Sequence, residues 1–107
     1  MKQLNDSTIY NVKELIDYEN GKVVTKAVAQ TSSGAVMLRA ADEGTVIPEH
    51  TVPFTVVLYV LDGEAEIHID DKVFNPKAGE ILVLPANHAH MLKARKRFTI
   101  MLSKLPQ

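Results

Sequence analysis

The sequence predicts an all-β protein, and three observations support this. Beyond residue 22, short runs of β-branched and other apolar residues alternate with turn residues such as Asn, Asp and Gly. Within residues 64–70, Ala65, Ile67 and Ile69 alternate with polar neighbours, which is the period of a strand with one buried face. No helical pattern separates these runs. About eight short strands at such close spacing are typical of an antiparallel sandwich or a closed barrel.

The length of 107 residues predicts a single domain, residues 1–107. A chain of this size buries roughly two thirds of the surface that it exposes when unfolded. That is enough for one core. Hydrophobic residues make up 46% of the chain and charged residues 23%, which is typical of a globular protein, and no internal repeat is present.

Charge and composition exclude several classes of function. The net charge of -1 provides no broad basic face, so we expect no nucleic-acid partner. Cysteine is absent, which excludes disulfides, thiolate zinc sites and a cysteine nucleophile. The N-terminus lacks the apolar stretch of a secretion signal, and the longest apolar run, Val56–Leu61, is too short to cross a bilayer. We therefore expect a cytoplasmic protein with no membrane partner.

The order of elements begins with one short helix and continues with strands. A helical turn is expected within Asn11–Tyr18, where three apolar residues recur at helical spacing, and Asn20-Gly21 is a strong turn signal just beyond it. We expect Asp62-Gly63 to form a hairpin turn between two strands, and the basic run Lys93–Arg97 to form another. The expected strands are Val23–Thr31, Ala35–Ala41, Phe54–Leu61, Glu64–Asp70, Lys72–Asn75, Ile81–Leu84, His90–Ala94 and Phe98–Ser103.

Two sets of residues carry a resemblance to a known family. The first set is Gly44, His50 and Gly63; the second is Gly79, Pro85 and His90, with Asn87 at a glycine position and Ala94 at an asparagine position. By these motifs the chain from about Val23 to Leu102 resembles the cupins, and it looks closest to their small stand-alone members. The resemblance implies a cupin-like double-stranded β-helix, or jelly-roll barrel, and a homodimer, since single-domain cupins commonly pair through their sheets.

The resemblance also bears on metal binding. In metal-binding cupins the two motifs supply three histidines and a glutamate to one cation. Carried over by position, His50 and His90 remain, whereas Val52 stands at the second histidine and the glutamate falls on Val56 or Val57. Valine has no lone pair, and a catalytic zinc normally takes three protein ligands. We therefore expect no cofactor from the inherited positions.

His88 offers one compensation for the missing ligands. It lies two residues before His90 and shares its face if the strand already runs there. A shifted triad of His50, His88 and His90 would then hold a divalent transition metal. Against this, Pro85-Ala86-Asn87 is typical of a turn, where alternation fails, so that His88 would simply form a hydrogen bond at the barrel mouth.

The alternation of side chains predicts what lines the barrel interior. Val52, Phe54, Val56, Leu58 and Val60 share the parity of His50 if no bulge intervenes, and with His90 they would line a pocket for an apolar or aromatic small molecule. The alternative is plain core packing, because side chains nearly fill the interior of an eight-stranded barrel.

Two further polar residues have positions that alternation predicts. Arg39 shares the side of Met37; it would bind a ligand carboxylate if that side points inward, and would be an ordinary exposed strand residue if it does not. His68 shares the parity of Glu64 and Glu66, so we expect it on the solvent face with no role in the site.

The function that these observations favour is binding of a small, largely apolar molecule, with no reaction assigned and no catalytic residue named. The rival hypothesis is a metal-dependent enzyme, an oxygenase or isomerase, that uses His50, His90 and His88. A third hypothesis is a ligand-sensing domain of the kind found in transcription regulators. It would need a separate partner, because we expect no room for a helix-turn-helix in 107 residues.

Overall fold

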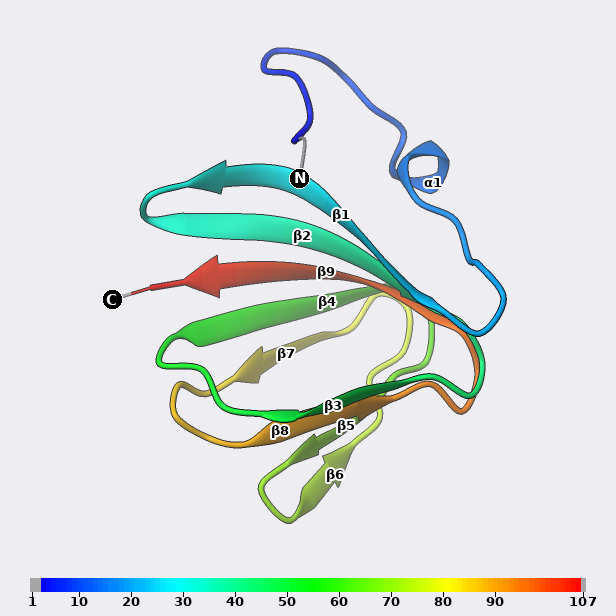
Figure 1. The fold of residues 1–107 in the computed structure, drawn as a ribbon, viewed down its shortest axis with the longest axis vertical. Coiled ribbons are helices and arrows are strands. Elements are labelled where there is room, and N and C mark those ends of the chain that lie inside the picture. Colours follow the sequence, from blue (N-terminus) through cyan, green and yellow to red (C-terminus); the bar gives the residue numbers. More distant parts are fainter. Residues whose placement is uncertain (1–2, 107) are drawn as a thin grey trace.

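The computed structural model describes residues 3–106, which form two antiparallel sheets that face each other (Figure 1). The five-stranded sheet has the order β1-β2-β9-β4-β7 and the four-stranded sheet the order β3-β8-β5-β6. The first contains β1 (Val23–Thr31), β2 (Gly34–Ala41), β9 (Phe98–Leu105), β4 (Thr55–Gly63) and β7 (Ile81–Leu84). The second contains β3 (Val46–His50), β8 (His90–Lys93), β5 (Glu66–Ile69) and β6 (Lys72–Phe74).

The predicted all-β class is confirmed, with one short helix, α1 (Val12–Leu15). The Asn11 side chain caps this helix by accepting a hydrogen bond from the Lys13 backbone N–H at 3.0 Å. The helix ends earlier than predicted because Ile16 already has extended backbone angles. Within residues 3–106 no helix is long and apolar enough to span a membrane.

Strand β3 is the element that sequence patterns missed. It contains Pro48, which lacks a backbone donor and is confined to edge positions in sheets. β3 is indeed the edge of the four-stranded sheet, where only β8 pairs with it, and its register is irregular between Ile47 and His50. Its exposed, proline-containing sequence carries no alternation that could reveal it.

The two hairpins predicted at Asp62-Gly63 and at the basic run are wrong. β4 pairs with β7 and β9, whereas β5 pairs with β6 and β8, so the chain crosses between the sheets after Gly63. It crosses again between β8 and β9. Turn residues specify a change of direction but not the pairing partner. A crossing lets both flanking strands place their apolar faces in the interface between the sheets.

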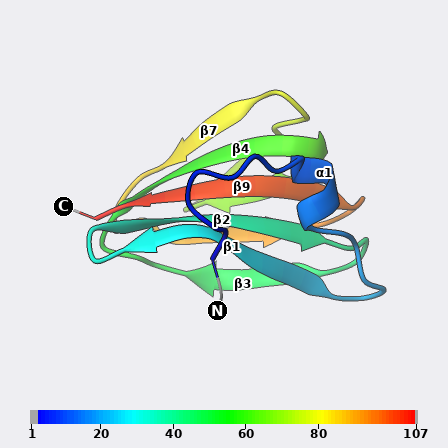
Figure 2. The same cartoon turned by 90° about the horizontal axis from the view of Figure 1, so that it is seen from above.

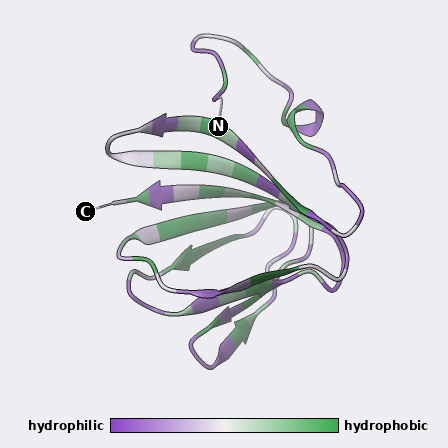
Figure 3. Cartoon of the chain, viewed as in Figure 1, coloured by the Kyte–Doolittle hydropathy of each residue, from purple (hydrophilic) through white to green (hydrophobic). Residues whose placement is uncertain are grey.

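The core lies between the sheets and consists of the inward-facing side chains of both. Figure 3 shows hydrophobic segments along strands of both layers. The fully buried members from the five-stranded sheet include Leu58, Val60 and Ile100, and Ile67 faces them from the four-stranded sheet. The core therefore depends on strict alternation in the strands that pack against each other.

The segment before β1 runs across the outer face of the five-stranded sheet (Figure 2). Leu4 donates its backbone N–H to the Val28 carbonyl oxygen at 3.1 Å. The Tyr18 hydroxyl donates to Asp62 Oδ2 at 2.6 Å and accepts from Thr99 Oγ1 at 2.9 Å. Burial, reinforced by the hydrogen bond to Asp62, raises the pKa of Tyr18 to about 12. The segment is thus anchored through polar contacts to β4 and β9.

The basic link between β8 and β9 consists of residues 94–97. Its two arginines are exposed and form ion pairs with carboxylates. Arg95 Nε donates to Glu66, and Arg97 Nη2 donates to Asp42 Oδ1 at 2.9 Å. Asp42 Oδ2 also accepts from the Gly21 backbone N–H at 2.8 Å. The Gly21 N–H, followed by Arg97, holds the pKa of Asp42 below its usual value. Through Asp42, these contacts connect the link before β1, the link between β2 and β3 and the link between β8 and β9.

Gly63 provides a stability test of the first crossing. Its φ of 74° disfavours any side chain, and an added Cβ would collide with the Arg97 carbonyl oxygen. Gly79 has a φ of 89°, but an added Cβ would meet no atom within 4 Å. We expect Gly79→Ala to lower the free energy of unfolding by about 1–3 kcal/mol through backbone strain alone. Gly63→Ala should cost clearly more in urea unfolding, and equal losses would contradict the close approach.

Candidate functional site: a cavity between the sheets

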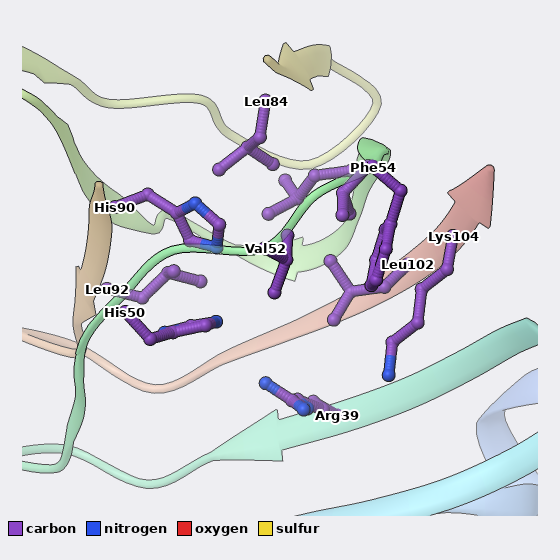
Figure 4. A pocket seen from close by; sticks show the side chains of 11 residues that line it. Arg39, His50, Val52, Phe54, Leu84, His90, Leu92, Leu102 and Lys104 are labelled. Atoms are coloured by element: carbon purple, nitrogen blue, oxygen red, sulfur yellow. The ribbon is translucent and has the colours of Figure 1, made fainter. Parts of the chain in front are cut away.

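A cavity of about 260 Å³ lies between the two sheets, where several strand ends meet (Figure 4). His50 ends β3, His90 begins β8 and Leu84 ends β7. All but one of the residues predicted as pocket lining are found in its wall: Arg39, His50, Val52, Phe54, Val56, Leu58 and His90. Val60, which shares their parity, lies deeper and is fully buried in the core.

The two histidines are cross-strand neighbours. β3 and β8 pair His50 with His90, and the ring centroids are 4.3 Å apart at an interplanar angle of 68°. His50 Nδ1 donates to the Pro48 carbonyl oxygen at 2.9 Å, and His90 Nδ1 donates to the His88 carbonyl oxygen at 3.3 Å. Because a carbonyl oxygen only accepts, each Nδ1 carries a proton. In the neutral rings, Nε2 is then a free acceptor.

Burial distinguishes the two imidazoles. His50 is exposed, whereas His90 is only 5% exposed. Desolvation, followed by the charges of His50 and Arg39, lowers the pKa of His90 below its ordinary value of 6.5, against the opposing hydrogen bond to His88. His90 is therefore neutral at pH 7. It is able to accept a hydrogen bond from a bound molecule or to take a proton from it.

The loop before β8 positions His90. Asn87 stands at the glycine position of the second motif and has a φ of 66°, a left-handed conformation that Asn tolerates better than most residues. Its backbone N–H donates to the Val52 carbonyl oxygen at 2.8 Å, which joins the two loops at the cavity mouth. The same loop directs His88 elsewhere: its Nδ1 lies 2.6 Å from Asp70 Oδ2, and the pair is about half exposed.

The residues present do not fit the metal site of the metal-binding cupins. Val52, Val56 and Val57 bring no donor atom. His88 is bonded to Asp70 and is not part of the cavity lining. In the described part of the chain, no group of three or more His, Asp or Glu side chains is arranged to hold a metal ion. Two imidazoles fall short of the usual three protein ligands.

Several lining residues were not predicted: Leu84, Leu92, Leu102 and Lys104. Alternation within β7, β8 and β9 could have found the leucines. Lys104 was missed because the last strand was expected to end at Ser103, whereas β9 continues to Leu105. Lys104 pairs with Val56 of β4, and both contribute to the cavity wall.

His68 is less exposed than expected. Its side chain is 27% exposed, and Nε2 lies 2.8 Å from Glu66 Oε2, while Arg95 bonds the other oxygen of the same carboxylate. Arg95, followed by His68, lowers the pKa of Glu66 to about 2. This cluster lies on the outer side of β5, because the adjacent residues Ile67 and Ile69 are buried in the core. It does not contribute to the cavity.

Comparison with known proteins identifies the family. The model of the AraC-like ligand binding domain matches residues 33–105. The chain belongs to this family. All the lining residues of the cavity, from Arg39 to Lys104, fall within the matched segment of this AraC-like domain. No curated protein matches the chain by sequence.

Solved structures confirm the cupin fold that was predicted for this AraC-like domain. It is similar to a cupin 2 conserved barrel domain protein from Leptotrichia buccalis, with 31% identity, a TM-score of 0.86, and coverage of 90% of this chain and 47% of that one. A cupin superfamily protein from Desulfitobacterium hafniense gives a TM-score of 0.89 at 24% identity, covering 99% and 97% of the two chains. A conserved protein of unknown function from Streptococcus pyogenes gives 0.90 at 22% identity, covering 97% and 91%.

The environment of His90 leads to an NMR test. We expect the His90 ring signals, assigned with His90→Gln, to titrate below pH 6.5. Because the unfolded chain then binds the proton before the folded one, the wild type should lose stability relative to His90→Gln as the pH falls from 6.5 through the lowered pKa. Titration at or above 6.5 would contradict the burial of this imidazole.

Proposed function

We propose that this AraC-like domain binds a small, largely apolar molecule in the cavity between its sheets. The observation that carries the proposal is a cavity of about 260 Å³ with a mostly aliphatic and aromatic wall, in which two imidazoles and two cationic side chains are the polar groups. Ligand sites commonly combine an apolar wall with a few polar groups that orient the ligand. The ligand-binding family to which the chain belongs supports the same function.

The size of the cavity favours a ligand over plain core packing. In another protein, an apolar cavity of about 150 Å³ binds benzene. A space of about 260 Å³ has room for one ring with a short substituent, or for a medium-length alkyl chain. Phe54 and Val52 lie in the loop before β4 rather than in a ladder, so this part of the wall is able to adjust to a ligand.

We further propose that binding serves sensing rather than turnover. Among residues 3–106, the lining includes no hydroxyl or thiol nucleophile, no carboxylate and no set of three metal ligands. The family is described as a ligand-binding domain, in line with the hypothesis of a sensor that acts with a separate partner. The proposal therefore names no catalytic step for His50 or His90.

Occupancy of the cavity is testable with a neutral probe of one ring, toluene, whose binding is followed by saturation-transfer NMR. We expect the wild type to bind toluene, and Val52→Phe, which fills the cavity, to weaken binding by at least about tenfold. Val73→Phe is the matched control, because Val73 is 51% exposed on β6 and outside the cavity, and it should bind as the wild type does. Equal affinity in Val52→Phe would refute binding in this cavity.

The homodimer stays a prediction, and the outer face of β7 is where we propose that a second copy binds. Ile81 and Val83 are 63% and 54% exposed there, in register with Tyr59 and Val57 of β4. We expect light scattering coupled to gel filtration to give a dimer for the wild type. Ile81→Glu should weaken association more than about tenfold by burying a charge, whereas Val73→Glu should not. A monomeric wild type at high protein concentration would contradict the prediction.

A further inference from the structure

The cavity carries fixed positive charge that the protein does not balance. Arg39 from β2 and Lys104 from β9 both contribute to its wall, and no Asp or Glu of the described part of the chain does. Among residues 3–106, the ion pairs engage Arg95, Arg97, His68 and His88, and neither of the two cavity cations takes part in one. An apolar cavity with two cations and no anion attracts a negatively charged molecule.

Arg39 shows most clearly that a partner is missing. Its Nε is buried and has no hydrogen-bond partner among the described residues. Burial lowers the pKa of Arg39, which reflects the cost of keeping its charge away from water. A buried donor without a partner costs free energy and is rare in folded proteins. A ligand oxygen close to the guanidinium would remove this cost.

The direction of the side chain is set by the strand register. β2 pairs Arg39 with Ile100 of β9, a core residue of the inner face, so the alternation that buries Ile100 also directs Arg39 inward. In Figure 4 the guanidinium of Arg39 and the side chain of Lys104 lie on one side of the cavity, and Leu84 lies across from them. The cavity therefore has one cationic side and one apolar side.

We propose that the ligand is an apolar monocarboxylate, an aryl- or alkyl-carboxylic acid. Its carboxylate accepts hydrogen bonds from Arg39 and is attracted by Lys104, while its apolar body lies against Phe54, Leu84 and Leu102. The planar guanidinium matches a carboxylate through two parallel hydrogen bonds. The inference rests on the proposed function, because it names the chemical class of the molecule that occupies the same cavity.

The test compares acids with their uncharged amides. Binding of octanoate, octanamide, phenylacetate and phenylacetamide is measured by methyl NMR at neutral pH and fixed salt, following signals of Leu84 and Leu102. The proteins are the wild type, Arg39→Met, which keeps the apolar stem of the side chain, and Lys72→Met, which removes one positive charge from exposed strand β6. We expect the wild type and Lys72→Met to bind each acid at least about tenfold more tightly than its amide.

Arg39→Met should abolish this preference while changing amide affinity by less than about threefold. Because the variant removes a buried donor that has no partner, we also expect it to be at least as stable as the wild type without ligand. Octanoate should raise the melting temperature of the wild type and not that of Arg39→Met. The stability measurement and amide binding together show that the variant is folded.

The outcomes separate the two proposals. Amide binding with no preference for the acid in the wild type would overturn the carboxylate assignment and leave the proposed function intact. An acid preference that survives in Arg39→Met would also overturn it, as would displacement of octanoate by inorganic phosphate at equal concentration. Failure of the neutral probe and of all four compounds to bind would refute the proposed function itself.

Discussion

The alternation of side chains along β4 is the constraint on which the rest of the structure depends. Its inward residues Val56, Leu58 and Val60 are buried between the sheets, while its outward residues face the other way. The same inward side continues into the preceding loop, where Phe54 lines the cavity. Because the period of a strand is two residues, a slip of one residue would empty the core and the cavity wall together. The register of β4 therefore fixes both the core and the cavity wall.

The two ends of the sandwich are built differently. Figure 1 shows the sheets close together at one end and diverging at the other. At the narrow end, Asp42 joins the link after Tyr18 to the link before β9 through Gly21 and Arg97. At the other end the Asn87 N–H bonds the Val52 carbonyl oxygen across two loops, and a cavity lies between the strands that carry His50, His90 and Lys104. The narrow end is closed by ion pairs and hydrogen bonds between links, whereas the opposite end holds the cavity.

The cavity differs from the metal site of the metal-binding cupins at two ligand positions, where this chain has Val52 and either Val56 or Val57. Val52 and Val56 belong to its apolar wall, and among the described residues no carboxylate lines it beside His50 and His90. The polar groups of the cavity are then Arg39, Lys104 and two imidazoles. This is the basis of the proposal that the ligand is an amphipathic anion, because charge balance has to come from the ligand.

The amino-acid sequence by itself determined the all-β class, the bounds of β1 and β7, the inward face of β4 and the motif positions of His50 and His90. These follow from local alternation and spacing, which a single strand already contains. Only the tertiary structure decided that Gly63 and the basic link cross between sheets, that β3 pairs with β8, that His88 turns to Asp70, and that Arg39 meets Lys104 in one cavity. Each of these depends on which distant strand lies alongside, and pairing between residues far apart in the chain is set by the joint burial of both sheets rather than by any local pattern.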